Sequence, residues 1–175
     1  MTEINLHKAK AENAEEICQL INTAYRGDLG WTNETYIVAG ERTNINDVEA
    51  LLNKSNSHML IATYSNRIIA CICIETKDKQ AYIGSFAVSP ATQNTGIGKK
   101  TLSFAENFAI DQLGISKLIM SVISQRTELI EFYERRGYTR TGQKDSYPVH
   151  LNVGAPLVND LTIEYLEKHM LTGPK

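Results

Sequence analysis

The chain has 175 residues, of which 42% are hydrophobic, and its 18 lysine and arginine residues against 20 aspartate and glutamate residues give a net charge of −2. This length and composition predict a single globular domain over residues 1–175. The near-neutral charge argues against a general attraction to nucleic acid, and no apolar run is long enough to cross a membrane.

The three cysteines, Cys18, Cys71 and Cys73, all lie in apolar stretches. Their odd number, and the lack of a C-x-x-C spacing or a histidine cluster, predict small core residues in a reducing compartment rather than a disulfide or a metal site. The opening residues MTEINLHKAK also lack the apolar segment of a signal peptide. We therefore expect a cytoplasmic protein that holds no metal.

The chain begins with a predicted strand and a predicted helix. Ile4 and Leu6 alternate with polar residues, which is typical of a strand. Asn13 is a candidate helix cap with Glu16 as its capping-box partner, and apolar residues at helical spacing follow as far as Gly27.

Residues 27–46 are polar, irregular and rich in glycine, and a loop of this length is often functional. A short helix is predicted over residues 47–52. Three strands then follow over residues 59–64, 67–75 and 81–88, joined by short polar turns, which predicts an antiparallel meander.

The second half of the chain alternates helices and strands. It contains a main helix that ends at Gly114, a strand over 118–122, a helix over 126–136, a strand over 138–141, an irregular stretch over 142–159 and a last strand over 161–166. The complete order, βααβββαβαββ, predicts a mixed α/β protein with a right-handed β-α-β crossover through the main helix.

The most informative stretch joins the third strand of the meander to the main helix. Pro90 ends the strand, and the chain then reads Gln93, Asn94, Thr95, Gly96, Ile97, Gly98 and Lys99. The first turn of a helix has unpaired N–H groups and a partial positive charge, and glycines let an anion approach the backbone. The stretch is therefore either a plain helix start or a loop that binds a phosphate or pyrophosphate.

A second stretch, residues 131–138, reads EFYERRGY and by itself predicts a helix with an apolar face that ends at Gly137. Together the two stretches resemble the GNAT superfamily of N-acetyltransferases. The pattern Gln93-x-x-Gly96-x-Gly98 after V-x-P resembles the pyrophosphate loop of that family. FYERRGY resembles the F-Y-x-x-x-G-[FY] signature that closes its acetyl-CoA site. The resemblance covers nearly the whole chain and is strongest over residues 81–142.

The resemblance implies an α/β fold of GNAT type, with a mostly antiparallel twisted sheet of about seven strands and about four helices. It implies transfer of an acetyl group from acetyl-CoA to a primary amine, by direct attack in a ternary complex. The residues that it implies for cofactor binding are Phe86, Ala87, Val88, Gln93, Asn94, Thr95, Gly96, Ile97, Gly98 and Lys99. Backbone amides of Phe86 and Val88 would hold the pantetheine arm like an added strand, and one near Phe86 would polarise the thioester carbonyl.

Tyr133 takes the place of the family's tyrosine near the cofactor sulfur, where it would also bind the cofactor and protonate the departing thiolate. Without the resemblance, Tyr133 reads as a core aromatic residue. One position departs from the family pattern, because Arg126 stands where many relatives have an asparagine that bonds the cofactor. Either Ser124 or Gln125 substitutes for that asparagine, or Arg126 faces the 3′-phosphate or an acidic acceptor.

The acceptor amine must lose a proton before it attacks, and Glu75 is the candidate base. Its alternative is a solvated glutamate at a strand end. Trp31, Glu34 and Arg42 lie in the long irregular loop, which in the family lies beside the acetyl end of the cofactor. They form either a plain surface loop or the wall of the acceptor site, where Trp31 would stack on the acceptor and Arg42 would pair with a carboxylate.

Residues 147–150 lie in the other loop expected at the acceptor site. Tyr147 is a candidate acceptor-binding residue, and His150 is either a base or a solvated histidine. The acceptor stays open among amino acids, polyamines, aminoglycosides, peptides and protein lysines, with the slightly acidic net charge favouring a cationic one.

Two other functions are weighed against the enzyme. One is a GNAT-like module that holds acyl-CoA as a sensor without turnover, and the other is a nucleotide-binding protein that uses the same anion loop. A homodimer is also considered, because the apolar last strand could pair across an interface.

Overall fold

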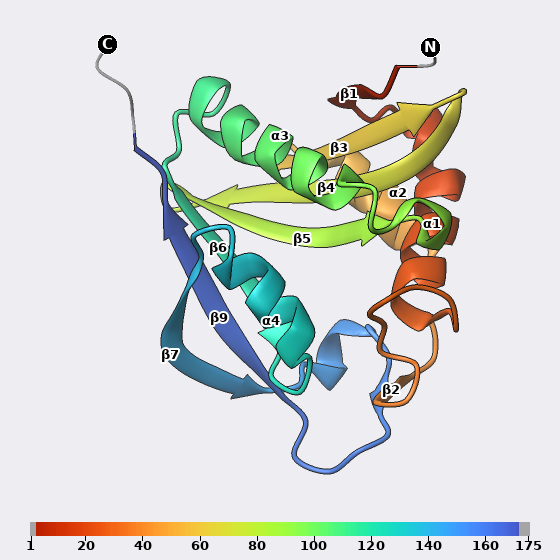
Figure 1. Ribbon diagram of the computed structural model, residues 1–175, viewed down its shortest axis with the longest axis vertical. Coiled ribbons are helices and arrows are strands. Elements are labelled where there is room, and N and C mark those ends of the chain that lie inside the picture. Colours follow the sequence, from red (N-terminus) through yellow and green to blue (C-terminus); the bar gives the residue numbers. More distant parts are fainter. Residues whose placement is uncertain (1–2, 172–175) are drawn as a thin grey trace.

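The computed structural model describes residues 3–171. They form a seven-stranded sheet in the order β1-β3-β4-β5-β6-β9-β7, with helices on both faces (Figure 1). The strands are β1 (Asn5–Lys8), β3 (Ser57–Tyr64), β4 (Arg67–Lys77), β5 (Gln80–Val88), β6 (Lys117–Ile123), β7 (Thr139–Ser146) and β9 (Thr162–His169). All neighbouring strands are antiparallel except β5 and β6, as the mixed α/β prediction required.

The four α-helices divide between the two faces of the sheet. They are α1 (Ala14–Arg26), α2 (Ile45–Asn53), α3 (Ile97–Asp111) and α4 (Thr127–Glu134). Helices α1 and α2 pack on one face, over the side chains of Met59, Ile61, Cys71 and Cys73. Helices α3 and α4 pack on the other face in a second apolar cluster (Figure 1). Cys71 and Cys73 are therefore core residues, as predicted.

Strands β5 and β6 separate part-way along their length, and this split positions the site. Their parallel pairing ends at Ile83 and Met120, although the strands continue to Val88 and Ile123 (Figure 1). Beyond the split, the edge of β5 that faces β6 has no strand partner among the described residues. Unpaired strand edges present rows of free N–H and C=O groups.

A bulge in β5 lies at the split. Cys71 pairs with Ala87 and Cys73 pairs with Gly84, so β5 has one more residue than β4 between these pairs. Ser85, inside the bulge, has φ of 46°, and its carbonyl accepts a hydrogen bond from the Cys71 thiol at 3.3 Å. A bulge of this kind bends the strand and re-aims its backbone groups.

The structure corrects several expectations outside the core. Strand β7 runs to Ser146 rather than to residue 141, because its exposed polar residues show no apolar alternation. A two-stranded sheet joins β2 (Val38–Ala39) to β8 (Ala155–Pro156), inside the two stretches predicted to be irregular. Strands of two residues have no periodicity to detect.

The prediction that the last strand could pair across a dimer interface is also wrong. Strand β9 lies between β6 and β7, so both of its edges are paired within the chain. It cannot pair across an interface in the way expected.

Glu16 is not a capping-box partner, because its carboxylate accepts the backbone N–H of Ile68 at 2.9 Å and ties α1 to β4. Within residues 3–171, no helix is both long and apolar enough to span a membrane.

Candidate active site

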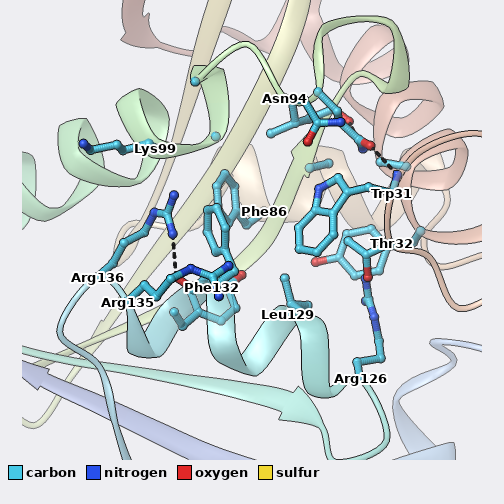
Figure 2. Close-up of a pocket in the computed structure, with 18 residues that line it drawn as sticks. Trp31, Thr32, Phe86, Asn94, Lys99, Arg126, Leu129, Phe132, Arg135 and Arg136 are labelled. Atoms are coloured by element: carbon cyan, nitrogen blue, oxygen red, sulfur yellow. Dashed lines mark hydrogen bonds between the residues drawn. The ribbon is translucent and has the colours of Figure 1, made fainter.

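A cavity of about 360 Å³ opens where β5 leaves β6, between the start of α3 and the helix α4 (Figure 2). Its volume lies within the range of about 300–1,000 Å³ typical of small-molecule sites. The residues that line it include Phe86, Ala87, Val88, Gln93, Asn94, Gly96, Gly98, Lys99, Leu129, Phe132 and Tyr133. The two motifs found in the sequence therefore meet at one cavity, which we call the large cavity.

The N-terminus of α3 forms one wall of the large cavity. Gly96 is its N-cap residue, with φ of 85°, and no side chain of the described residues caps the helix. A Cβ atom on Gly98 would lie 3.6–3.9 Å from the side chains of Val88, Phe132 and Phe86, in the mouth of the cavity. The first turn of a fifteen-residue helix thus presents its N–H groups and positive dipole end with little side-chain cover.

The large cavity is cationic. Lys99, Arg126, Arg135 and Arg136 line it, and no carboxylate among the described residues does so. The Arg136 guanidinium lies 3.4 Å from the centre of the Phe132 ring and donates to the Phe132 carbonyl at 2.6 Å (Figure 2). Partial burial lowers the pKa of Arg136, with the neighbouring Arg135 adding to the effect. This set of charges fits a phosphorylated ligand.

Trp31 and Gln93 close one side of the large cavity. The Gln93 side-chain amide accepts the backbone N–H of Trp31 at 2.9 Å and donates to the Val88 carbonyl at 3.1 Å. The Trp31 ring lies 6.1 Å from the Phe132 ring, at 42° to it (Figure 2). Trp31 was expected in the acceptor site, but the Gln93 bond holds it against the large cavity instead.

Tyr133 is buried and lines the large cavity. Its ring packs between Phe86 and Tyr138, with centroid distances of 6.4 and 5.8 Å. Its hydroxyl has no hydrogen-bond partner within residues 3–171, and burial raises the pKa of Tyr133 well above its usual value of 10. The phenol is therefore held as a neutral proton donor. Tyr133 belongs to the apolar cluster under α3 and α4 and lines the cavity, so its position is compatible with both expectations, core aromatic and site residue.

A second, smaller cavity of about 120 Å³ adjoins the first across Tyr133, and we call it the small cavity. It occupies the gap between the diverging strands, beside the bulge. Its lining includes Tyr25, Glu34, Arg42, Ser85, Phe86, Ser121, Arg126, Tyr133, Tyr147 and Pro148. Both loops expected at the acceptor end thus reach this cavity, and the pairing of β2 with β8 joins them.

Glu34 and Arg126 form a buried ion pair between the two cavities. The Glu34 carboxylate accepts from Arg126 Nη1 at 3.0 Å, and Arg26 holds its other oxygen, with Nη2 at 3.0 Å. Arg126 Nη2 also donates to the Thr32 hydroxyl at 2.8 Å. Arg126 therefore ties the 27–46 loop to the start of α4, and Glu34 is held by two guanidiniums rather than left free for an acceptor.

Several predicted site residues lie outside both cavities. Glu75 pairs across the sheet with Tyr82, short of the bulge, and forms an exposed ion pair with Lys54. Glu75 lines neither cavity, so its position does not support the prediction of a base there, and the sequence does not show how far along its strand the site lies. Ser124 accepts a hydrogen bond from Thr162 at 2.8 Å, on the β9 side of β6, and lines neither cavity.

Three more residues of the predicted set have other surroundings. The Thr95 hydroxyl donates to the Thr92 carbonyl within its own loop, and Ile97 is buried beside Val88. His150 is exposed, and it lines neither cavity.

Sequence reasoning also missed residues that line the cavities. Arg135 and Arg136 belong to the FYERRGY stretch and line the large cavity, although the sequence analysis predicts no site role for their charges. The signal was available, because helical spacing places them one turn from Phe132. Tyr25 and Thr32 gave no such signal, since only the tertiary fold brings α1 and the following loop against β5.

Comparison with known proteins agrees with this geometry. The model of the acetyltransferase (GNAT) family matches residues 14–138. The chain belongs to the GNAT family. The family resemblance predicted from the two motifs is thereby confirmed, and the α/β fold predicted from it is the fold observed.

Curated and structural relatives of this GNAT protein are distant. It is 37% identical over 73 residues to the S-(2-succino)cysteine N-acetyltransferase of Bacillus subtilis, an alignment that covers 41% of this chain and 44% of that protein. The ribosomal-protein-S18-alanine N-acetyltransferase of Escherichia coli superposes with a TM-score of 0.72 at 13% identity, covering 98% of this chain and 97% of that one. The Salmonella typhimurium protein yncA, solved with its cofactor acetyl-CoA, gives 0.71 at 16% identity, covering 99% and 98%. The chain thus spans less than half of the curated relative, and the structural neighbours share the fold.

Proposed function

We propose that this GNAT protein transfers the acetyl group of acetyl-CoA to a primary amine of a small molecule or peptide, by direct attack in a ternary complex. The observation that carries the proposal is the meeting of two cavities at Tyr133 and the β5 bulge. The large cavity suits a phosphorylated donor, and the small cavity leaves room for an acceptor beside the same tyrosine.

The residues of the large cavity fit acetyl-CoA. The first turn of α3 and the cations Lys99, Arg135 and Arg136 would hold its phosphates. The unpaired edge of β5 beyond Ile83 would bind the pantetheine amides as an added strand. When bound, acetyl-CoA supplies an acetyl group activated as a thioester. The position of Gly98 leaves the mouth of the cavity open to such a chain.

The chemistry proposed for this chain rests on two groups. The backbone of the bulge, re-aimed at Phe86, would donate to the oxygen on which charge develops. Tyr133 would donate its proton to the leaving sulfur. A covalent intermediate on cysteine is not part of the proposal, because burial raises the pKa of Cys71 to about 12 and that of Cys73 to about 11. Neither thiol is a thiolate at neutral pH.

The pH dependence of kcat/KM should follow the pKa of the acceptor amine rather than the pKa of a group on the protein. The one carboxylate that lines the small cavity, within the described residues, is Glu34, which two arginines hold, and no histidine lines it. Because its pKa is raised, Tyr133 keeps its proton to higher pH than a free phenol does. We expect kcat/KM to rise with pH to a plateau near the pKa of the acceptor amine, with no fall below about pH 10.

This expectation is checked with two acceptors whose amine pKa values differ by one unit or more. The rising limb should move with the acceptor. A limb that stays at the same pH for both amines would reveal a base on the protein and contradict the expectation.

Trp31 provides the test of the proposed function, because it is the single tryptophan of the sequence and it lines the large cavity. Titrating acetyl-CoA into the purified protein should change the Trp31 emission in a saturable manner. CoA should compete, and ATP at the same low concentration should not. CoA release on adding amines then separates an enzyme from an acyl-CoA sensor. A protein that gives no saturable response and no calorimetric binding is not an acetyltransferase of this kind.

The acceptor panel starts from amino acids. The Bacillus subtilis relative is named for S-(2-succino)cysteine, which is a substituted amino acid, so substituted amino acids are included with simple amines. A cytoplasmic location is part of the proposal and is in keeping with the reduced state of Cys18, Cys71 and Cys73.

A further inference from the structure

The charges around the small cavity are unequal. Glu34 brings one negative charge, while Arg26, Arg42 and Arg126 bring three positive charges to this carboxylate and to the cavity wall. Arg26 and Arg126 are both bound to Glu34, and Arg126 also lies 3.9 Å from the Glu128 carboxylate, which leaves Arg42 as the guanidinium of this group without a carboxylate partner within residues 3–171. A cationic acceptor would therefore meet a site of its own sign, whatever the net charge of the whole chain.

Arg42 is also built into the wall rather than loose on the surface. Asn22 on α1 accepts the backbone N–H groups of Arg42 and Thr43, at 2.8 and 3.1 Å. The Arg42 guanidinium carbon lies 5.2 Å from the centre of the Tyr25 ring, and the side chain is half-buried. Within residues 3–171 its guanidinium has no hydrogen bond and no ion pair. Its donors are free, and the backbone and the ring hold its position.

The other polar groups of the small cavity are neutral or already bonded. The Tyr147 hydroxyl donates to the Val153 carbonyl at 2.8 Å. The hydroxyls of Ser85 and Ser121 can hydrogen-bond a ligand but cannot balance a charge. A ligand that fills the cavity and satisfies its one free charged group must therefore carry an anion.

We propose that the acceptor is a small amine that bears a carboxylate, such as an amino acid, and that Arg42 binds this carboxylate in the small cavity. The inference rests on the proposed acetyltransferase function and names its substrate class. The planar fork of a guanidinium binds a carboxylate with two parallel hydrogen bonds. Arg42, Tyr133 and the bulge residue Ser85 all line this one cavity, so an acceptor whose carboxylate is held at Arg42 lies in the same cavity as the proposed proton donor. The cavity of about 120 Å³ suits an acceptor of this size.

The test compares acceptors that differ in the carboxylate alone. Rates of CoA release are measured with L-methionine, with L-methioninamide and with 3-(methylthio)propylamine, for the wild type, Arg42→Gln and Arg42→Lys. We expect the wild type to prefer the acid. Arg42→Gln should lower kcat/KM for the acid by about 10- to 100-fold. It should leave kcat/KM nearly unchanged for the two analogues that lack the carboxylate. Arg42→Lys should lie between, because it keeps the charge and loses the fork.

The control variant is Arg67→Gln, which removes an exposed arginine that pairs with Glu16 and lines neither cavity. It should leave all three acceptors unchanged. Acetyl-CoA binding, followed by Trp31 emission, should be the same in every variant. Equal wild-type rates for acid and amide, an equal loss for both in Arg42→Gln, or turnover of polyamines alone would overturn the inference and leave the acetyltransferase standing. A wild type that does not bind acetyl-CoA would overturn the proposed function, and this inference with it.

Discussion

Replacing Tyr133 by phenylalanine should lower kcat by about 10²- to 10³-fold and leave acetyl-CoA binding nearly unchanged. The ring makes the packing contacts of this residue with Phe86, Phe132 and Tyr138, and phenylalanine keeps that ring. The hydroxyl has no partner within the described residues, so its removal leaves no buried group unpaired. What the variant loses is the proton that the phenol would donate to the leaving sulfur.

The raised pKa of Tyr133 makes this expectation sharper. A group with a raised pKa is protonated throughout the assay range, so every molecule of wild type carries the proton to be donated. The defect of Tyr133→Phe should therefore be about the same at pH 7 and at pH 9. A leaving thiol of lower pKa needs less protonation as it departs. An acetyl thioester of such a thiol should therefore recover part of the rate that Tyr133→Phe loses.

Tyr138→Phe is the matched control for this prediction. Tyr138 packs against Tyr133 with the rings 5.8 Å apart, is fully buried, and lines neither cavity. Its variant should keep the wild-type kcat, with any cost appearing in thermal stability. An unchanged kcat in Tyr133→Phe, or an equal loss in both variants, would show that the hydroxyl of Tyr133 donates no proton in the reaction.

The donor side of the site was predictable because its determinants are local. The loop from Gln93 to Lys99 leads directly into α3, and Tyr133 lies in a helix whose start and end are marked in the sequence. Short-range patterns such as glycine positions and helical spacing carry this information. Two motifs were enough to place the large cavity, although not to foresee that Gln93 uses its side chain to hold Trp31.

The acceptor side depends on contacts between distant segments, and sequence reasoning was weaker there. Glu34 was chosen as a substrate residue, yet Arg26 and Arg126, from the two ends of the site, occupy its carboxylate. Glu75 was chosen as a base from its strand alone, and the position of the bulge relative to it follows only from the register of β4 and β5. Arg42, predicted to bind substrate, does line the small cavity, and its role there stays a prediction.

Replacing Gly96 by glutamate should weaken acetyl-CoA binding by more than about 100-fold. Gly96 caps α3 at the edge of the large cavity, and, its chain neighbours aside, no atom of residues 3–171 lies within 4 Å of the place where its Cβ would stand. A glutamate there has room to fit, and it brings a carboxylate to the point where phosphate oxygens would meet the helix dipole. Like charges placed together cost several kcal/mol, and each 1.4 kcal/mol is a factor of ten in Kd.

Gly114→Glu separates this effect from backbone strain. Gly114, past the far end of α3, also has a left-handed backbone, with φ of 66° against 85° for Gly96, and it too has open space around its Cβ position. Both substitutions cost roughly 1–2 kcal/mol of left-handed strain, so both variants should lose similar thermal stability. Only Gly96→Glu should lose acetyl-CoA binding by calorimetry.

Gly96→Gln then separates the effect of charge on acetyl-CoA binding from the effect of side-chain size, because glutamine has the size of glutamate without its charge. We expect an intermediate Kd, and we expect added salt to improve binding in Gly96→Glu more than in Gly96→Gln, since salt screens repulsion and leaves bulk unaffected. If Gly96→Glu binds acetyl-CoA as the wild type does, the phosphates do not lie at the N-terminus of α3. The cations Arg135 and Arg136, on the opposite wall of the large cavity, would then hold them instead.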